Sequence, residues 1–406
     1  MTRLSWPQLL LLGASFLITL GSFAVLPFMS VLLHQRWGLG LGVVGAVLAV
    51  ASLVQFSGGV VGAAVARRIG LRATMLVALA IRTAGFCCFV PGLQRPWLAV
   101  VALFLVSAGA ALYLPANKAY LVAGCAPEQR PRLLAASGSA FNAGMALGPP
   151  AAAPFVLTSP ALLFTVVAAV FAVVGLAHAV LPHAEDKPAE PVPSAAPEPP
   201  RPTAGVRLPP FAYTLLSVYV FMFFQHYIAL FAVPRTSAAY YGALLMAYSL
   251  LLVTAQPLLA DRIAGLGYGR TLWLGFGAMA AGMTAVATGG PLGIAVGALT
   301  LGLAETVLFL RNDLEALARS RAPAATVFGR QRLAAGLGAF AAALLGGPLY
   351  GAAEGGGGAG GFWLVVAAQS AVLPLLLWGA VVWRARRCGR RRGAGAGRPR
   401  APAPGG

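Results

Sequence analysis

The chain is divided near its middle by the stretch PHAEDKPAEPVPSAAPEPPRPTAGVRLPP, residues 182–210. This stretch is rich in proline and holds four of the ten acidic residues of the chain. It has too few apolar side chains to pack a core, so we expect it to be a flexible connection between two folded halves.

Long hydrophobic runs lie on both sides of this linker. A bilayer core requires about 20 apolar residues per helix, and six such runs precede the linker while six follow it. The sequence therefore predicts an all-α polytopic membrane protein with twelve transmembrane helices. We expect these helices at residues 9–33, 41–66, 73–91, 97–124, 133–156, 161–181, 211–233, 240–260, 271–289, 292–314, 325–350 and 362–383.

The composition excludes most soluble proteins. Hydrophobic residues make up 59% of the 406 residues and charged residues only 10%, whereas soluble chains carry about 25% charged residues. The net charge of +19 is typical of proteins that bind nucleic acid, but eight arginines follow residue 383 and most others flank the apolar runs. We therefore expect contact with membrane lipids and no nucleic-acid partner.

The positive charges predict how the protein lies in the membrane. With the N-terminus in the cytoplasm, all but six of the 29 lysines and arginines fall in cytoplasmic segments, and only Arg36, Arg95 and Arg235 fall in outside segments. Basic residues accumulate in cytoplasmic loops. We therefore expect a multi-pass protein of the plasma membrane with both termini in the cytoplasm.

The two halves share an internal repeat. A constant shift aligns the run 133–156 with the run 325–350, pairing Phe141 with Phe340 and Gly148-Pro149 with Gly347-Pro348. Repeats of this kind are common in secondary transporters. We expect an N-terminal six-helix bundle over 1–181, the cytoplasmic linker over 182–210, a C-terminal six-helix bundle over 211–383 and a disordered basic cytoplasmic tail over 384–406.

A basic loop follows the second run of each half. The first loop reads AAVARRIGLR over residues 63–72, and its residues Arg68, Gly70 and Arg72 have the spacing of a known transporter loop motif. The glycine and aspartate that this motif also contains are replaced in this chain by Ala63 and Arg67. The second loop, PLLADRIAGLGYGR over residues 257–270, keeps the acid–base pair Asp261 and Arg262.

The fifth run carries Gly144, Gly148 and Pro149, which form a Gly-x-x-x-Gly-Pro motif. With the basic loops, the segment YLPANKAYL in the fourth run and the segment LGLAE in the tenth, this motif resembles the major facilitator superfamily and its twelve-helix drug:proton antiporter branch. The resemblance covers residues 9–383. It implies the major facilitator fold, with helices 1, 4, 7 and 10 around a central cavity, a gating role for the loop residues and a tendency to export.

Glu305 is the leading functional candidate, because an ionisable side chain within a membrane is costly and marks a functional site by default. It lies near the middle of the run 292–314, in a helix that lines the cavity in proteins of this resemblance. Burial disfavours the charged form of a carboxyl group, so we expect Glu305 to exchange a proton and to attract a cationic substrate. The alternative is a permanent pairing with Arg311.

Arg82, Gln225, His226 and Asn117 are further polar residues within predicted spans. Arg82 cannot lose its charge, so it either binds substrate or gates, or else bonds to Gln55 or to carbonyl groups of a neighbouring helix. His226 titrates near physiological pH and either relays protons beside Gln225 or packs as a hydrogen-bonded side chain. We include Asn117, on helix 4, among the candidate site residues.

These features together predict a secondary transporter that exports hydrophobic or amphipathic small molecules in exchange for protons. Sugars and phosphates are poor candidates, because their recognition needs many polar or clustered basic groups. We expect a monomer with no cofactor and no metal site. Uptake by symport stays open as an alternative. A non-transporting polytopic membrane protein or a membrane enzyme is a remote alternative, and an enzyme is disfavoured because the four histidines and the few acids are scattered.

Overall fold

The computed structural model describes residues 5–123, 130–182, 208–320, 324–355 and 358–396, apart from some side chains within them. Within these ranges the chain is helical, without a strand. The first half holds α1 (Trp6–Val25), η1 (Leu26–Phe28), α2 (Met29–Val31), η2 (Leu32–Arg36), α3 (Leu41–Ile69), α4 (Leu71–Gly92), α5 (Pro96–Val122), α6 (Arg130–Ala152) and α7 (Pro160–Ala179). The second half holds α8 (Pro210–Arg235), α9 (Ala238–Gly265), α10 (Tyr268–Ala287), α11 (Pro291–Arg319), α12 (Ala324–Gly355) and α13 (Gly360–Ala396).

The segment from Trp6 to Arg36 is helical throughout, although its geometry changes after Val25. Pro27 lies in the 3₁₀ turn η1, where its missing N–H interrupts the α-helical hydrogen bonds. Counting α1 to η2 as one segment, the described residues form twelve long helical segments, one for each predicted span. The prediction of a twelve-helix, all-α membrane protein is therefore confirmed.

Nine of these segments are long and apolar enough to cross a membrane, judged on the described residues alone. Of the other three, α3 contributes a shorter apolar part, Leu41–Phe56. The remaining two, α6 and α10, contain many glycine, serine or other weakly apolar residues, so their assignment as spans depends on their place between neighbouring helices.

Prolines and glycines mark many helix boundaries. Pro96, Pro160, Pro210 and Pro291 each lie in the first turn of a helix, where the missing N–H has no helical partner to lose. Gly70 separates α3 from α4 with φ +83°, a left-handed conformation that glycine adopts without a steric penalty. The turn between α3 and α4 therefore explains why a glycine stands at this position of the first basic loop.

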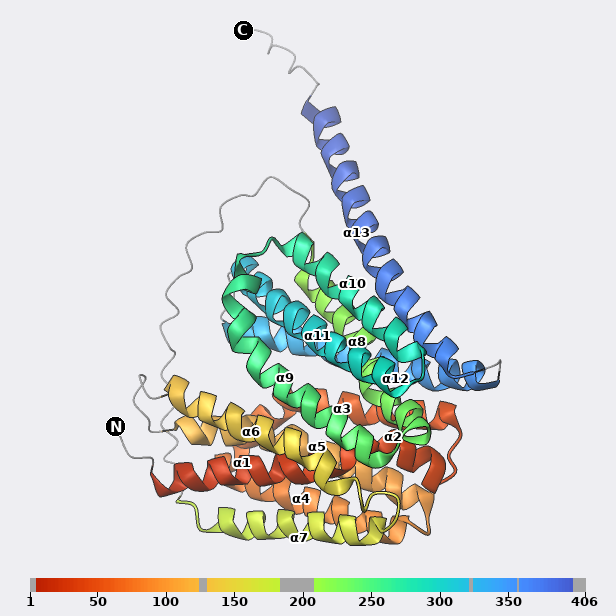
Figure 1. The fold of residues 1–406 in the computed structure, drawn as a ribbon. Coiled ribbons are helices and arrows are strands. Elements are labelled where there is room, and N and C mark those ends of the chain that lie inside the picture. Colours follow the sequence, from red (N-terminus) through yellow and green to blue (C-terminus); the bar gives the residue numbers. More distant parts are fainter. Residues whose placement is uncertain (1–4, 124–129, 183–207, 321–323, 356–357, 397–406) are drawn as a thin grey trace, which may run out of the picture.

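The helices form two groups with the same internal packing (Figure 1). In the first group α1 packs on α6, while α4 packs on both α5 and α7. In the second group α8 packs on α12, while α10 packs on both α11 and α13. The repeat detected in the sequence is thus also a repeat of helix contacts.

The groups are joined mainly by two pairs of long helices, α3 with α12 and α6 with α9, and the short elements η1 and α2 also contact α8. We call the end at which the linker attaches the linker end and the opposite end the distal end. At the distal end the Tyr241 hydroxyl donates to the Pro27 carbonyl oxygen at 3.2 Å, and Gly242 packs on Pro149 and Pro150. In Figure 1 the groups meet at the right, at the distal end, and spread apart toward the left.

The last helix is longer than the sequence predicts. We expected disorder from residue 384, but α13 continues as a helix to Ala396. Its arginine-rich part prolongs an apolar helix without a proline or a turn sequence until the glycines near its end, so nothing stops the helix at the expected point. Residues 397–406, and residues 183–207 of the linker, lie outside the described part of the chain.

Candidate functional site

Glu305 lies about halfway along α11 and is partly buried. Its carboxylate oxygen Oε2 accepts a hydrogen bond from the hydroxyl of Tyr248 on α9. The ring of Tyr248 passes over Gly302, one turn earlier on α11: a Cβ atom at Gly302 would lie 3.0 Å from Cε2 of Tyr248. Glycine at this position thus leaves room for the tyrosine to reach the carboxylate.

A cluster of aromatic rings extends from Tyr248. The ring of Phe224 on α8 lies 6.0 Å from that of Tyr248, centroid to centroid, and the ring of Phe221 lies 5.7 Å from that of Phe309 on α11. Tyr248 itself is only 4% exposed. Glu305 is therefore a carboxyl group whose recorded polar contact is the Tyr248 phenol, and that phenol belongs to a cluster of aromatic rings.

Arg311 does not pair with Glu305, which contradicts the structural alternative considered for this acid. The Arg311 guanidinium bonds to Glu315, with Nη2 2.9 Å from Oε2, and Arg319 bonds to the same carboxylate at 2.5 Å. Both arginines also lie over the ring of Tyr268. This cluster lies at the linker end of α11, where Glu315 forms an ion pair with each of the two arginines.

Arg82 lies inside the first group of helices and is 3% exposed. Its Nη2 donates to Ser22 Oγ on α1 at 2.5 Å, and its guanidinium carbon lies 4.5 Å from the ring centre of Phe171 on α7. The side chain also fills the space beside Gly109 on α5. Its structural partner is thus Ser22 rather than the Gln55 side chain considered from the sequence.

Asn117 and His226 each make one contact with a serine of another helix. Asn117 Nδ2 donates to Ser15 Oγ at 3.0 Å, so that α5 is bonded to α1. His226 Nε2 on α8 lies 3.4 Å from Ser52 Oγ on α3, so this contact crosses between the two groups. The neighbouring Gln225 is partly buried on α8.

The basic loops lie at the linker end. Arg72 donates from Nη2 to the Ala179 carbonyl oxygen and so ties the start of α4 to the end of α7. Arg68 and Arg262 are exposed. The side chain of Asp261 lies outside the described part of the chain, so the second acid–base pair stays a prediction.

The Gly-x-x-x-Gly-Pro motif of α6 lies where three helices meet. A Cβ atom at Gly144 would lie 2.6 Å from the Phe16 carbonyl oxygen, and one at Gly148 would lie 2.7 Å from that of Leu20, so both glycines touch the backbone of α1. Pro149, next along the chain, contacts Gly242 of α9. The motif therefore packs α6 on its own group and on the other group at once.

The candidate residues thus occupy separate contacts, with Glu305 in the second group, Arg82 and Asn117 in the first, and His226 between them. Sequence reasoning missed Tyr248 and the serine partners. Gly302 belongs to the LGLAE segment noted in the sequence, three residues before Glu305 and so on the same helix face, but its contact with Tyr248 was not predicted.

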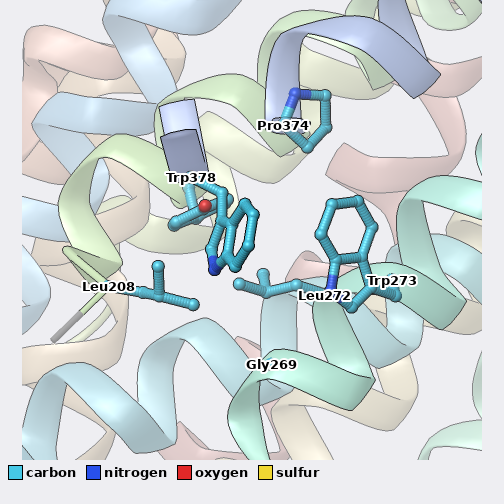
Figure 2. A pocket seen from close by; sticks show the side chains of 7 residues that line it. Leu208, Gly269, Leu272, Trp273, Pro374 and Trp378 are labelled. Atoms are coloured by element: carbon cyan, nitrogen blue, oxygen red, sulfur yellow. The ribbon is translucent and has the colours of Figure 1, made fainter. Parts of the chain in front are cut away.

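A small apolar pocket lies away from Glu305, at the linker end of the second group (Figure 2). It is lined by Leu208, Tyr213, Gly269, Leu272, Trp273, Pro374 and Trp378. Its lining holds no charged side chain, so we do not assign it to the same site.

Comparison with solved structures shows the fold. The nucleoside transporter NupG has a TM-score of 0.72 with 13% identity over 92% of this chain and 99% of that chain. An auto-inhibited POT family peptide transporter has a TM-score of 0.70 with 15% identity over 93% and 96%. The human organic anion transporter MFSD10 has a TM-score of 0.62 with 17% identity over 91% and 98%.

Sequence comparison gives a partial relative and a family. The multidrug resistance protein MdtH of Salmonella typhimurium is 31% identical over 139 residues, which is 34% of this chain and 34% of that protein. The match thus spans about a third of the relative. The model of the Major Facilitator Superfamily matches residues 11–343. With its many apolar helices, the chain is a multi-pass membrane protein, and it belongs to the major facilitator superfamily.

Proposed function

We propose that this protein is a proton-coupled exporter of hydrophobic or amphipathic organic compounds, and that Glu305 carries the exchanged proton. The observation that carries the proposal is the setting of Glu305. It is a mid-helix carboxyl group among aromatic rings, bonded to Tyr248 and not to Arg311.

This setting suits proton exchange. A carboxylate without a basic partner is costly in an apolar environment, so taking up a proton relieves the cost and releasing one restores a negative charge. The negative form attracts a cationic substrate, and the neutral form does not. Competition of proton and substrate for one carboxyl group is sufficient for exchange, as the two helix groups expose the site to each side of the membrane in turn.

The aromatic surroundings favour an apolar substrate. Phe221, Phe224 and Phe309 offer ring surfaces rather than hydrogen bonds, and such a lining suits hydrophobic and amphipathic compounds. The partial similarity to a protein named for multidrug resistance supports the same substrate class. Asn117, Gln225 and His226 are proposed as supporting residues of the transport path, whereas Arg82, which bonds to Ser22 within the first group, is proposed as a structural residue.

The test uses purified protein in liposomes with an imposed pH gradient and a lipophilic cationic dye. We expect Glu305→Gln to abolish dye movement driven by the gradient, while the protein stays monodisperse. Glu354→Gln is the matched control, because Glu354 is exposed at the distal end of α12. Gradient-driven transport by Glu305→Gln at the parental rate overturns the proposal.

The same assay decides the direction. An alkaline interior drives accumulation of the dye by a symporter and depletion by an antiporter, so accumulation supports uptake, the alternative that the sequence leaves open. We further propose that the protein acts as a monomer in the plasma membrane, with the linker end in the cytoplasm. Labelling of a cysteine placed in the linker by an impermeant reagent added outside intact cells contradicts that orientation.

A further inference from the structure

Helix α9 connects the Glu305 site to the contact between the two helix groups. It packs on α11, which carries Glu305, and on α6 of the first group. Tyr248 is the residue of α9 that reaches Glu305, whereas Tyr241 and Gly242 touch the first group at the distal end. Tyr241 and Tyr248 are two helical turns apart, so they lie on nearly the same face of one continuous helix.

The distal contact of α9 is close. The Tyr241 hydroxyl donates to the Pro27 carbonyl oxygen, and the Tyr241 ring meets the edge of Phe28 at 5.2 Å between centroids. A Cβ atom at Gly242 would lie 2.9 Å from Cα of Pro150. A small movement of α9 along or across α6 therefore changes this contact, since backbone meets backbone and no flexible side chain takes up the change.

The Glu305 contact of α9 is also well defined. Gly302 sets how closely the Tyr248 ring approaches α11, and Phe224 of α8 lies on another side of that ring. Among the charged groups that the structure describes on α11 itself, Arg311 and Arg319 both bond to Glu315. On α10, which packs on α11, Arg270 is exposed and Tyr268 lies against those two arginines. On α12, Arg332 is exposed and lies toward Asp313. On α8, His226 contacts Ser52. Tyr248 is therefore the titratable side chain recorded in contact with the Glu305 carboxyl group.

We propose that Tyr248 is a positioning residue that transmits the charge state of Glu305 to α9 and so to the distal contact between the helix groups. The proposal rests on the proposed role of Glu305 as the proton carrier. A hydroxyl donates a stronger hydrogen bond to a charged carboxylate than to a neutral carboxyl group. Protonation thus weakens the tie between α9 and α11, and α9 carries the change to Tyr241 and Gly242.

The test measures the distal contact directly. Spin labels are attached at Thr158→Cys and Ala239→Cys, two exposed distal positions on either side of the α6–α9 contact, with the four native cysteines replaced by alanine. The distance between the labels is recorded by pulsed electron paramagnetic resonance in acidic and alkaline buffer. We expect a pH-dependent change of the distance distribution in the parent and none in Tyr248→Phe or Glu305→Gln.

Matched controls separate this role from a loss of packing. Tyr219→Phe also removes a hydroxyl, which donates to Gln369 at 2.6 Å within the second group, and it is expected to keep the parental response. Gly302→Ala keeps the Tyr248 hydroxyl but displaces its ring, and it is expected to reduce the response. Gly277→Ala, where nothing lies within 4 Å, is its control.

Transport provides the second readout. We expect Tyr248→Phe to slow gradient-driven transport by about tenfold, the factor given by about 1.4 kcal/mol, with the substrate KM unchanged.

If Glu305→Gln loses the pH response but Tyr248→Phe keeps it, the role of Tyr248 is overturned and the proposed function stands. If the parent shows no response, the inference is likewise overturned. If Glu305→Gln responds and transports as the parent does, the proposed function itself fails. Should Tyr248→Phe not fold, Gly302→Ala decides in its place.

Discussion

The Arg82 guanidinium donates to the Ser22 hydroxyl oxygen at 2.5 Å inside the first group of helices, although the chain contains no acidic residue before Glu128. The charge of Arg82 is therefore balanced without a carboxylate from any helix of its own group. A hydroxyl and the face of Phe171 take that place, and cations over aromatic rings are favourable when desolvated.

This arrangement predicts that Arg82 is structural and replaceable by an apolar side chain. Arg82→Met fills similar space without a buried charge, and such replacements are often neutral or stabilising. Arg82→Lys keeps a charge but loses the planar stacking, and we expect it to be less stable than Arg82→Met by about 1–3 kcal/mol. Thermal unfolding in detergent and dye transport are the measurements. If Arg82→Met folds but does not transport the dye, Arg82 has a direct role in transport instead.

The short distance between His226 and Ser52 predicts that replacing Ser52 by cysteine creates a metal site that joins the two helix groups. The Nε2 and Oγ atoms are 3.4 Å apart, which matches the spacing of a histidine nitrogen and a cysteine sulfur on one zinc ion. We expect micromolar Zn²⁺ to inhibit transport by Ser52→Cys and a chelator to restore it. The double variant Ser52→Cys/His226→Gln is the control. Equal inhibition of the two variants shows that the pair does not form the bridge.

The packing of α6 on α1 predicts a stability cost at Gly144. A Cβ atom there would lie 2.6 Å from the Phe16 carbonyl oxygen, and overpacking of this kind costs about 1–3 kcal/mol. Gly138 lies on the same helix with nothing within 4 Å, so Gly138→Ala is expected to be neutral or slightly stabilising. Thermal unfolding of both variants checks the difference, which has to vanish if α6 does not approach α1.

The left-handed turn at Gly70 predicts a second glycine effect. Its φ of +83° with ψ of 161° is unfavourable for alanine, by about 1–3 kcal/mol. The corresponding turn of the second half has Gly267 with φ −64° and open space around it, and alanine fits there. Gly70→Ala is thus expected to lower the unfolding temperature while Gly267→Ala leaves it unchanged or raises it. The reverse order contradicts the assigned turn.

The sequence predicted the spans well because most of them are long apolar runs bounded by prolines, glycines or charges, and the weaker runs lie between them. The expected run 292–314, for example, lies within α11, which begins at Pro291. The repeat was visible in Gly148-Pro149 and Gly347-Pro348 because close helix contacts admit only small residues. The end of α13 was not predicted, since a basic composition alone does not stop a helix that is already formed.

The contacts of the candidate site were beyond sequence reasoning. Glu305 was identified because an acid in an apolar run is rare, but its partner Tyr248 lies on another helix, fifty-seven positions earlier in the chain. From the sequence, Arg311 on the same helix was a possible partner of Glu305, but in the structure Arg311 forms an ion pair with Glu315. Which groups meet depends on the rotation of each helix about its axis, and that rotation is set by packing between helices.

The crossing of α6 and α9 joins Gly242 to Pro149 and Pro150 through main-chain atoms. Such a close contact requires a glycine on one helix and is made with main-chain atoms of the two prolines on the other. The side chains of the proposed substrate site take no part in this main-chain contact. They can therefore differ between relatives of this chain while the contact between its two halves stays the same.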